Sequence, residues 1–482
     1  MVNITYGLLQ ATSAAIDGTE TYSINPSGTD LIATTSDGAV AAYDPGDLIM
    51  IPGLGYLYSG VQASRHWYIW GYSLAFSPGG NSFIGDSRYF LLRGVLEQPV
   101  PQANNKVPEV VYMIYQQMFA SLVPAIFIGA AAERGRVLPA LIFTFCWATI
   151  VYCPVARWVW APQGWAFQLG VLDYAGGGPI ETLSGATGLA YSIFLGKRRG
   201  WGTHVLSFKP HNVSSVVLGT VMLWFGWLGF NGGSTFAANL KAAMAITCTN
   251  MAASMGGLTW MLLDYRLERK WSAVGFCTGA ICGLVAITPA AGYVSVHAAI
   301  LIGVLAAGIS NLLTALKGFF AFDDAMDIYA CHGVAGIVGL VFTGVFAEAS
   351  VTANDAYSAI SGGWVDRNFI VVGYQFAWFC ACFGWSFVMT LILMFLINLI
   401  PGCKFRTDEE SEIVGVDDVE CGEWAYDFVH IRRDVESTAG FHSHPPRNSE
   451  AAQVQKLVEA NRNGHSEPKT EKQPSVVQAV EA

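Results

Sequence analysis

Long apolar runs with almost no charge recur through most of this sequence and restrict its fold more than any other feature. Between Leu48 and Ile400 these runs repeatedly approach about 20 residues, the length that crosses a bilayer as a helix. Only 13% of the 482 residues are charged, against about 25% in soluble globular proteins. The runs lack the apolar–polar alternation of barrel strands. The sequence therefore predicts an all-α polytopic membrane protein.

Candidate spans and loop charges give a topology. We place spans near residues 48–60, 67–76, 108–132, 136–158, 178–195, 213–232, 236–263, 271–288, 293–316, 328–347 and 370–400. Alternate loops are rich in Arg and Lys, as at 134–136, 197–199 and 266–270. Because basic loops stay in the cytoplasm, we expect these loops and the C-terminus to be cytoplasmic.

Composition divides the chain into four parts. We expect an extracellular N-terminal arm (1–47), a transmembrane transport domain (48–402), a cytoplasmic segment that docks on the membrane domain (403–433) and a disordered cytoplasmic tail (434–482). The net charge of −10 comes mostly from the acidic ends, which argues against a nucleic-acid partner. The chain has no Walker A or HExxH motif. We therefore expect that the protein has no cofactor, binds no metal and is not an enzyme.

Five ionisable residues lie in or beside the apolar runs: Asp173, Glu181, Asp324, Asp327 and His332. A charge at the bilayer centre costs about 3 kcal/mol, so such residues usually face a cavity or a partner. Glu181 and His332 each follow an Asp by five to eight residues and open a helix of small residues, which places His332 near a tight helix–helix contact. Paired half-motifs of this kind build the central site of inverted-repeat transporters. Taken alone, His332 is as compatible with a packed structural residue as with a pore residue.

Aromatic residues form a second group. Tyr115 and Phe119 are four residues apart, as are Phe230 and Ser234, and Trp160 lies at an outer boundary. Spacing alone favours an aromatic belt and ordinary core packing. A cluster of rings with a hydroxyl also suits a small cation.

Several motifs together resemble the ammonium transporter superfamily (Amt/Mep/Rh), and specifically a fungal ammonium permease. They include WGYSLAF, GAAAERGR, LDYAGGGPIE, WFGWLGFNGGS and DDAMDIYACHGVAGIVG, and the resemblance runs from about 45 to 433. It implies an eleven-helix fold with two inverted five-helix halves, and a homotrimer with one pore per subunit. It also implies a plasma-membrane protein that takes ammonium and methylammonium as substrates.

The resemblance assigns roles by motif position. Trp160, Ser234 and Tyr115 match an outer ammonium recruitment site, Phe119 and Phe230 a stacked gate, Asp173 a structural support, and His332 the second of two pore histidines. The family picture is that ammonium is recruited as the cation and deprotonated, and that ammonia and the proton then pass separately.

Glu181 departs from the common pattern, since most of the family has the other pore histidine there and a fungal subgroup has Glu. We expect Glu181 and His332 to titrate as a coupled pair and to relay the proton. The alternative is that Glu181 only holds His332 in place.

The second span is a further departure. Leu48 to Phe76 is only 29 residues, or about 43 Å of helix, too short for two crossings. Either one interrupted helix crosses once or a segment of about 20 residues has been lost from the deduced sequence. Two crossings would put the N-terminus outside, where Asn3 in N-I-T is a possible glycosylation site.

Three other functions compete with ammonium permeation. They are an ammonium sensor that signals through its tail, a neutral-gas channel of the Rh type, and a non-functional product that lacks its second span. The aromatic set with Ser234 favours cation capture over the gas channel.

Overall fold

The computed structural model describes residues 31–34, 40–43, 65–199, 201, 212–414 and 416–421. Helices dominate these residues, and six helical segments among them are long and apolar enough to cross a membrane. The predicted all-α polytopic fold is confirmed. The candidate span at 48–60 and the possible glycosylation site Asn3 lie outside the described residues.

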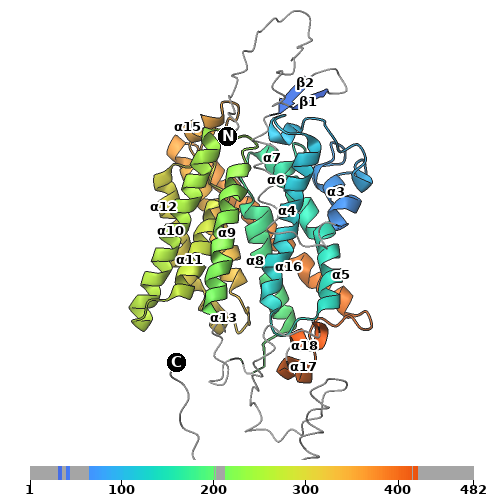
Figure 1. Ribbon diagram of the computed structural model, residues 1–482, viewed down its shortest axis with the longest axis vertical. Coiled ribbons are helices and arrows are strands. Elements are labelled where there is room, and N and C mark those ends of the chain that lie inside the picture. Colours follow the sequence, from blue (N-terminus) through green and yellow to red (C-terminus); the bar gives the residue numbers. More distant parts are fainter. Residues whose placement is uncertain are drawn as a thin grey trace, which may run out of the picture. The chain divides into compact units, whose positions relative to one another are not determined.

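The long helices of the bundle coincide with predicted spans (Figure 1). In chain order they are α4 (Glu109–Phe127), continued by η5 (Ile128–Ala131); α5 (Val137–Trp147), η6 (Ala148–Tyr152) and α6 (Cys153–Trp160); η7 (Gly177–Thr182) with α8 (Leu183–Leu195); α9 (Val213–Gly233); α10 (Leu240–Glu268); α11 (Ala273–Ile287); α12 (Val296–Leu313); η8 (Tyr329–Val334) with α14 (Ala335–Phe346); and α16 (Ile370–Asn398).

Short elements lie between and beyond the long helices. They are η2 (Trp67–Gly71), α3 (Tyr72–Phe76), η3 (Phe90–Leu92), η4 (Pro101–Ala103), α7 (Trp165–Leu169), α13 (Leu316–Phe319), α15 (Ala349–Thr352), η9 (Ala353–Asp355), η10 (Trp364–Asp366), α17 (Glu409–Val414) and α18 (Val416–Cys421). Figure 1 shows α7 and α15 at one end of the bundle and α17 and α18 at the other. We call these the α7 end and the α17 end.

Glycines let the central helices meet backbone to backbone. A Cβ at Gly185 of α8 would overlap the backbone nitrogen of Gly333 in η8, and one at Gly336 would lie 2.9 Å from Cβ of Glu181. Small residues permit this approach where lipid supplies no driving force between helices. The expectation that His332 lies on a tight helix–helix contact is confirmed.

The structure describes the second predicted span as helical from residue 65. Together η2 and α3 cover Trp67–Phe76, and the two residues before them are also helical. The indole of Trp70 donates to Oγ1 of Thr149 over 3.0 Å. Since Thr149 lies midway along the segment from Val137 to Trp160, the stretch Trp67–Phe76 packs beside the half of that segment toward the α7 end.

A small sheet precedes the membrane helices. Strands β1 (Leu31–Thr34) and β2 (Val40–Tyr43) pair antiparallel, with Leu31 opposite Tyr43 and Thr34 opposite Val40. The sequence had indicated only a polar arm in this region.

Candidate functional site

The five aromatic and hydroxyl residues singled out in the sequence form one cluster toward the α7 end. The hydroxyls of Tyr115 (α4) and Ser234, which follows α9, are hydrogen-bonded to each other. The ring centroids of Phe119 and Phe230 lie 4.5 Å apart. The indole of Trp160 contacts Phe119 edge-on at 5.8 Å. Helical spacing brings these side chains to one place from three separate helices.

The cluster has the groups that bind a small cation. The hydroxyl of Ser234 donates to the carbonyl of Phe230 over 2.8 Å. Tyr115 therefore donates to the oxygen of Ser234, which keeps one lone pair for a further donor. Because ring faces carry negative electrostatic potential, Trp160, Tyr115 and Phe119 together favour a cation near them. The rings of Phe119 and Phe230 are tilted at 49° to each other.

Asp173 supports this cluster from behind. Its Oδ1 accepts from the backbone N–H groups of Gly176 (2.9 Å) and Gly177 (2.6 Å). Its Oδ2 accepts from the N–H of Gly178 (2.7 Å) and from the indole of Trp378 (2.9 Å). Four donors occupy the buried carboxylate, which therefore caps the start of η7 rather than facing a cargo cation.

Glu181 and His332 are in direct contact. Nδ1 of His332 lies 2.8 Å from Oε2 of Glu181. The Glu181 side chain is 0% exposed. Its other oxygen, Oε1, has no hydrogen-bond partner among the described residues. The open oxygen provides a second place for a proton or a donor.

The two halves of this pair are built alike. Glu181 lies in η7 and His332 in η8, and both elements are π-helical turns, a form often found at functional sites. Asp324 caps η8 as Asp173 caps η7, because its Oδ2 accepts from the N–H of Tyr329 over 2.7 Å. The paired half-motif seen in the sequence is therefore a paired structural unit. Asp327, in contrast, binds Nζ of Lys317 at 2.7 Å.

Sequence reasoning missed the brace that α16 supplies. Besides Trp378, Gln375 accepts from the N–H of Leu172 (3.0 Å) and donates to its carbonyl (2.6 Å). Gln375 thus fixes the residue that precedes Asp173. The single amide side chain of Gln375 in a long apolar run is a sequence signal that could have identified this residue.

The comparisons with known proteins agree with this geometry. The profile of the Ammonium Transporter Family matches residues 56–426. The chain belongs to this family. It is 46% identical over 419 residues to Ammonium transporter 2 of Schizosaccharomyces pombe, covering 82% of this chain and 81% of that protein. It is 42% identical over 453 residues to Ammonium transporter MEP2 of Saccharomyces cerevisiae, covering 88% and 90%.

Solved structures of the Ammonium Transporter Family give the same result. The crystal structure of Saccharomyces cerevisiae Mep2 superposes with a TM-score of 0.69 at 44% identity, covering 76% of this chain and 85% of that one. Candida albicans Mep2 gives 0.69 at 43% identity, covering 76% and 84%. The resemblance read from the motifs is confirmed, and the family is one of transporters rather than enzymes.

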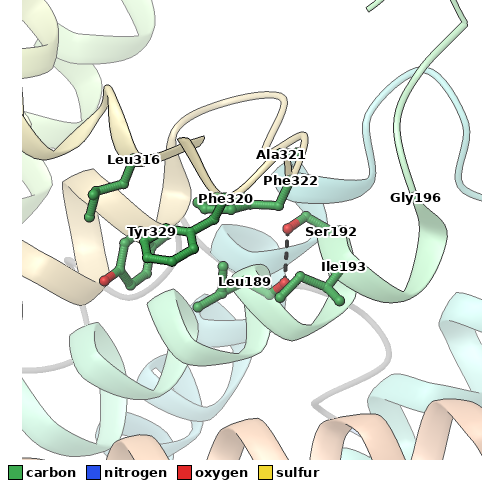
Figure 2. Close-up of a pocket in the computed structure, with 9 residues that line it drawn as sticks. All are labelled: Leu189, Ser192, Ile193, Gly196, Leu316, Phe320, Ala321, Phe322 and Tyr329. Atoms are coloured by element: carbon green, nitrogen blue, oxygen red, sulfur yellow. Dashed lines mark hydrogen bonds between the residues drawn. The ribbon is translucent and has the colours of Figure 1, made fainter. Parts of the chain in front are cut away.

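A cavity of about 440 Å³ lies toward the α17 end of this family member. In Figure 2 it is bounded by α8 on one side and by the segment from Leu316 to Phe322 on the other. Tyr329, three residues before His332, also lines it. Its walls are mainly apolar and do not include the Glu181–His332 pair.

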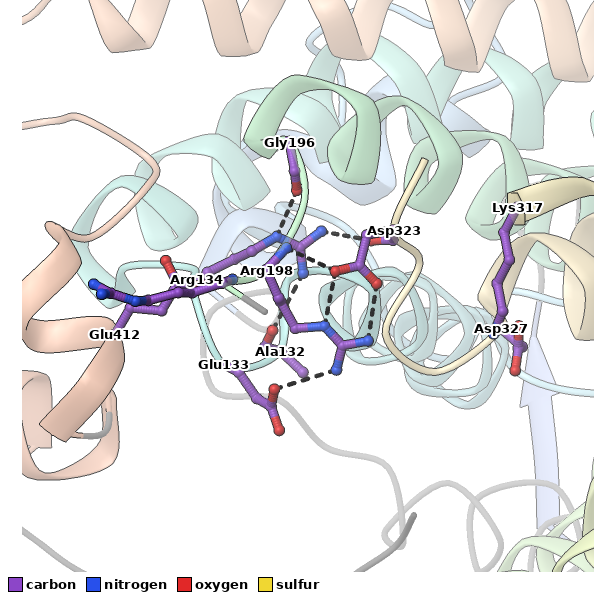
Figure 3. A network of polar contacts seen from close by, with 10 residues as sticks. Ala132, Glu133, Arg134, Gly196, Arg198, Lys317, Asp323, Asp327 and Glu412 are labelled. Carbon is purple, nitrogen blue, oxygen red and sulfur yellow. Dashed lines mark hydrogen bonds and ion pairs between the residues drawn. The ribbon is translucent and has the colours of Figure 1, made fainter. Parts of the chain in front are cut away.

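An ion cluster ties loops together at the α17 end (Figure 3). Arg198 binds both carboxylate oxygens of Asp323, at 2.9 and 2.8 Å. Arg134 is 0% exposed and donates to the carbonyls of Gly196 (2.9 Å) and Asp323 (2.6 Å). Burial raises the pKa of Asp323, but the bonds from Arg198 outweigh it and hold the pKa below its usual value. The cluster fixes the start of the loop after α8.

Proposed function

We propose that this chain is an ammonium transporter that captures the cation at the aromatic cluster, deprotonates it, and conducts ammonia and the proton through a pore containing Glu181 and His332. One observation carries the proposal: Trp160, Tyr115 and Ser234 form a cation-accepting cluster joined through Asp173 to the helix that bears Glu181. The printed names of the relatives, which are ammonium transporters, support the substrate. Methylammonium, which keeps the charge and the N–H donors, is a second substrate.

The first step is capture. Ammonium loses part of its hydration shell among the rings and donates to the oxygen of Ser234, while Trp160, Tyr115 and Phe119 stabilise its charge. The contacting rings of Phe119 and Phe230 then have to separate before cargo can pass. A bare cation is costly in the apolar interior beyond the gate.

The second step is separation of the proton. One N–H bond breaks, its electron pair stays on nitrogen as ammonia, and the proton passes to the Glu181–His332 pair. The contact at 2.8 Å and the open Oε1 of Glu181 support this relay. The alternative, that Glu181 only orients His332, predicts that the proton takes another path.

Assembly and location follow from the same proposal. We place the protein in the fungal plasma membrane as a homotrimer with one pore per subunit. The arm 1–47 is outside, and the segment 403–433 lies in the cytoplasm together with the tail 434–482, which is outside the described residues. Exposed apolar side chains on α9, such as Leu218 and Val221, support contact with lipid or another subunit.

The 29 residues from Leu48 to Phe76, too few for two full spans, favour one competing function, a product that does not transport. Expression of the chain in a fungal strain without its own permeases separates the two. Growth on low ammonium and saturable methylammonium uptake are the expected results, and Tyr115→Ala with Ser234→Ala is expected to weaken uptake more than tenfold. The proposal would be overturned if the strain failed to grow both with the chain as written and with about 20 residues restored to the second span.

A further inference from the structure

A buried lysine lies near the capture cluster and has no part in the steps above. Nζ of Lys241 forms an ion pair with Oδ2 of Asp355 at 2.9 Å, and the two side chains are 5% and 1% exposed. Lys241 lies at the start of α10, while Asp355 belongs to η9 between α14 and α16. The pair therefore joins two segments that are far apart in the chain.

Two aromatic rings complete the surroundings of this ammonium group. Nζ lies 5.7 Å from the ring centroid of Tyr174 and 5.8 Å from that of Tyr293. The two rings contact each other edge to face at 5.5 Å. A carboxylate with two rings is a setting that binds a primary ammonium ion. We call Lys241, Asp355, Tyr174 and Tyr293 the lysine cage.

The position of Lys241 breaks a local rule. It is the second residue of α10, where the helix dipole disfavours a positive charge. Asn239 already caps this terminus by accepting from the N–H of Ala242 over 3.0 Å. A buried charge in such a position needs compensation, which the lysine cage supplies. Departures of this kind are expected where a site has to be positioned.

The lysine cage touches both loops of the capture cluster. Tyr174 directly follows Asp173, whose carboxylate caps η7. On the other side, Asp355 accepts through Oδ1 from the N–H of Tyr357 over 3.0 Å. The hydroxyl of Tyr357 donates to the carbonyl of Thr235 over 2.9 Å, next to Ser234. One ammonium group thus links the backbone on both sides of the cluster.

We propose that Lys241 is a positioning residue of the capture site, a tethered ammonium that holds the Asp173 and Ser234 loops together through the lysine cage. The inference rests on the proposed capture of ammonium at that cluster. Burial raises the pKa of Asp355, but hydrogen bonds from Ser358 and Lys241 outweigh it and hold the pKa below its usual value.

Amine rescue tests the cage without requiring transport. In the purified full chain, Lys241→Ala leaves the carboxylate and two rings around an empty space. Propylammonium is expected to raise the unfolding temperature of Lys241→Ala by about 2 °C and to have no such effect on the unchanged protein. Two further variants are expected to show no rescue. One is Lys241→Met, which fills the cage with an apolar chain, and the other combines Lys241→Ala with Asp355→Asn.

Lys317→Ala is the matched control, since Lys317 pairs with Asp327 at 2.7 Å with side chains 37% and 32% exposed. Rescue of that variant equal to that of Lys241→Ala, or no rescue of Lys241→Ala, would overturn the cage. Should Lys241→Ala fail to accumulate, expression with propylammonium in the medium has to restore it, and failure to do so would also overturn the cage.

Uptake separates positioning from a purely structural role. Lys241→Ala is expected to raise the KM for methylammonium about tenfold with less than about a twofold change in maximal rate, and propylammonium is expected to reverse part of the increase. An unchanged KM, or an equal loss in maximal rate, would overturn the positioning role. Absence of uptake by the unchanged chain would count against the proposed function, while amine rescue would still decide whether the cage binds ammonium.

Discussion

Asp173 illustrates how one residue determines the local fold at the capture site. Its two oxygens accept from three consecutive glycine N–H groups and from Trp378, so all four lone pairs of the carboxylate have donors. The sequence showed an acid in an apolar setting but could not show its partners. Trp378 is 205 residues away, and only the folded bundle brings the two together.

Replacing Asp173 tests this capping role. Asp173→Ala leaves four buried donors without an acceptor and is expected to lower the free energy of unfolding by about 3 kcal/mol or more. Asp173→Asn keeps one acceptor oxygen and should lose less. Asp86→Ala, at a carboxylate 36% exposed beside Arg88, is a control expected to lose at most about 1 kcal/mol. Thermal unfolding in detergent measures all three, and an unchanged Asp173→Ala would contradict the role.

At the scale of elements, the central contact between α8 and η8 depends on glycine. Gly185→Ala is expected to cost about 2–3 kcal/mol, because the new Cβ would overlap backbone atoms of Gly333 that cannot rotate away. Gly373→Ala in α16 is the control, since a Cβ there meets no atom within 4 Å. It should raise stability slightly, by about 0.5–1 kcal/mol. Equal unfolding temperatures for the two variants would contradict this account.

Hydropathy predicted where the long helices lie, because apolar length alone determines a span. It also indicated that the 29 residues from Leu48 to Phe76 are too few for two full spans. It could not predict the π-helical turns at Glu181 and His332 or the brace from Gln375. These depend on contacts between helices distant in sequence. Paired Asp residues in the two halves were the available signal, and Asp324 rather than Asp327 proved to match Asp173.

At the scale of the whole molecule, ion pairs hold the segment after α16 to the α17 end. Glu420 binds Nε of Arg136 at 2.7 Å and accepts from the N–H of Val137 over 3.1 Å. Its carboxylate therefore also lies at the N-terminus of α5, where a negative charge is favourable. Glu409 and Glu412 bind Arg199 in addition.

Charge reversal tests this docking. Glu420→Lys is expected to release the segment and to raise its rate of cleavage by an added protease several-fold, because both the ion pair and the helix-terminus contact are lost. Combining it with Arg136→Glu should restore only part of the protection, since a lysine cannot accept from the N–H of Val137. Glu97→Lys, on a loop toward the α7 end, is a control, and cleavage equal in all variants would contradict docking through Glu420.

Ammonium-evoked current tests the central claim most directly. The purified full chain would be placed in proteoliposomes, and current and methylammonium uptake would be recorded for the unchanged protein and for Glu181→Ala. The account predicts a saturable current for the unchanged protein and its loss, by at least about tenfold, in Glu181→Ala, because the proton then lacks its path beside His332. Full current and full uptake in Glu181→Ala would contradict it.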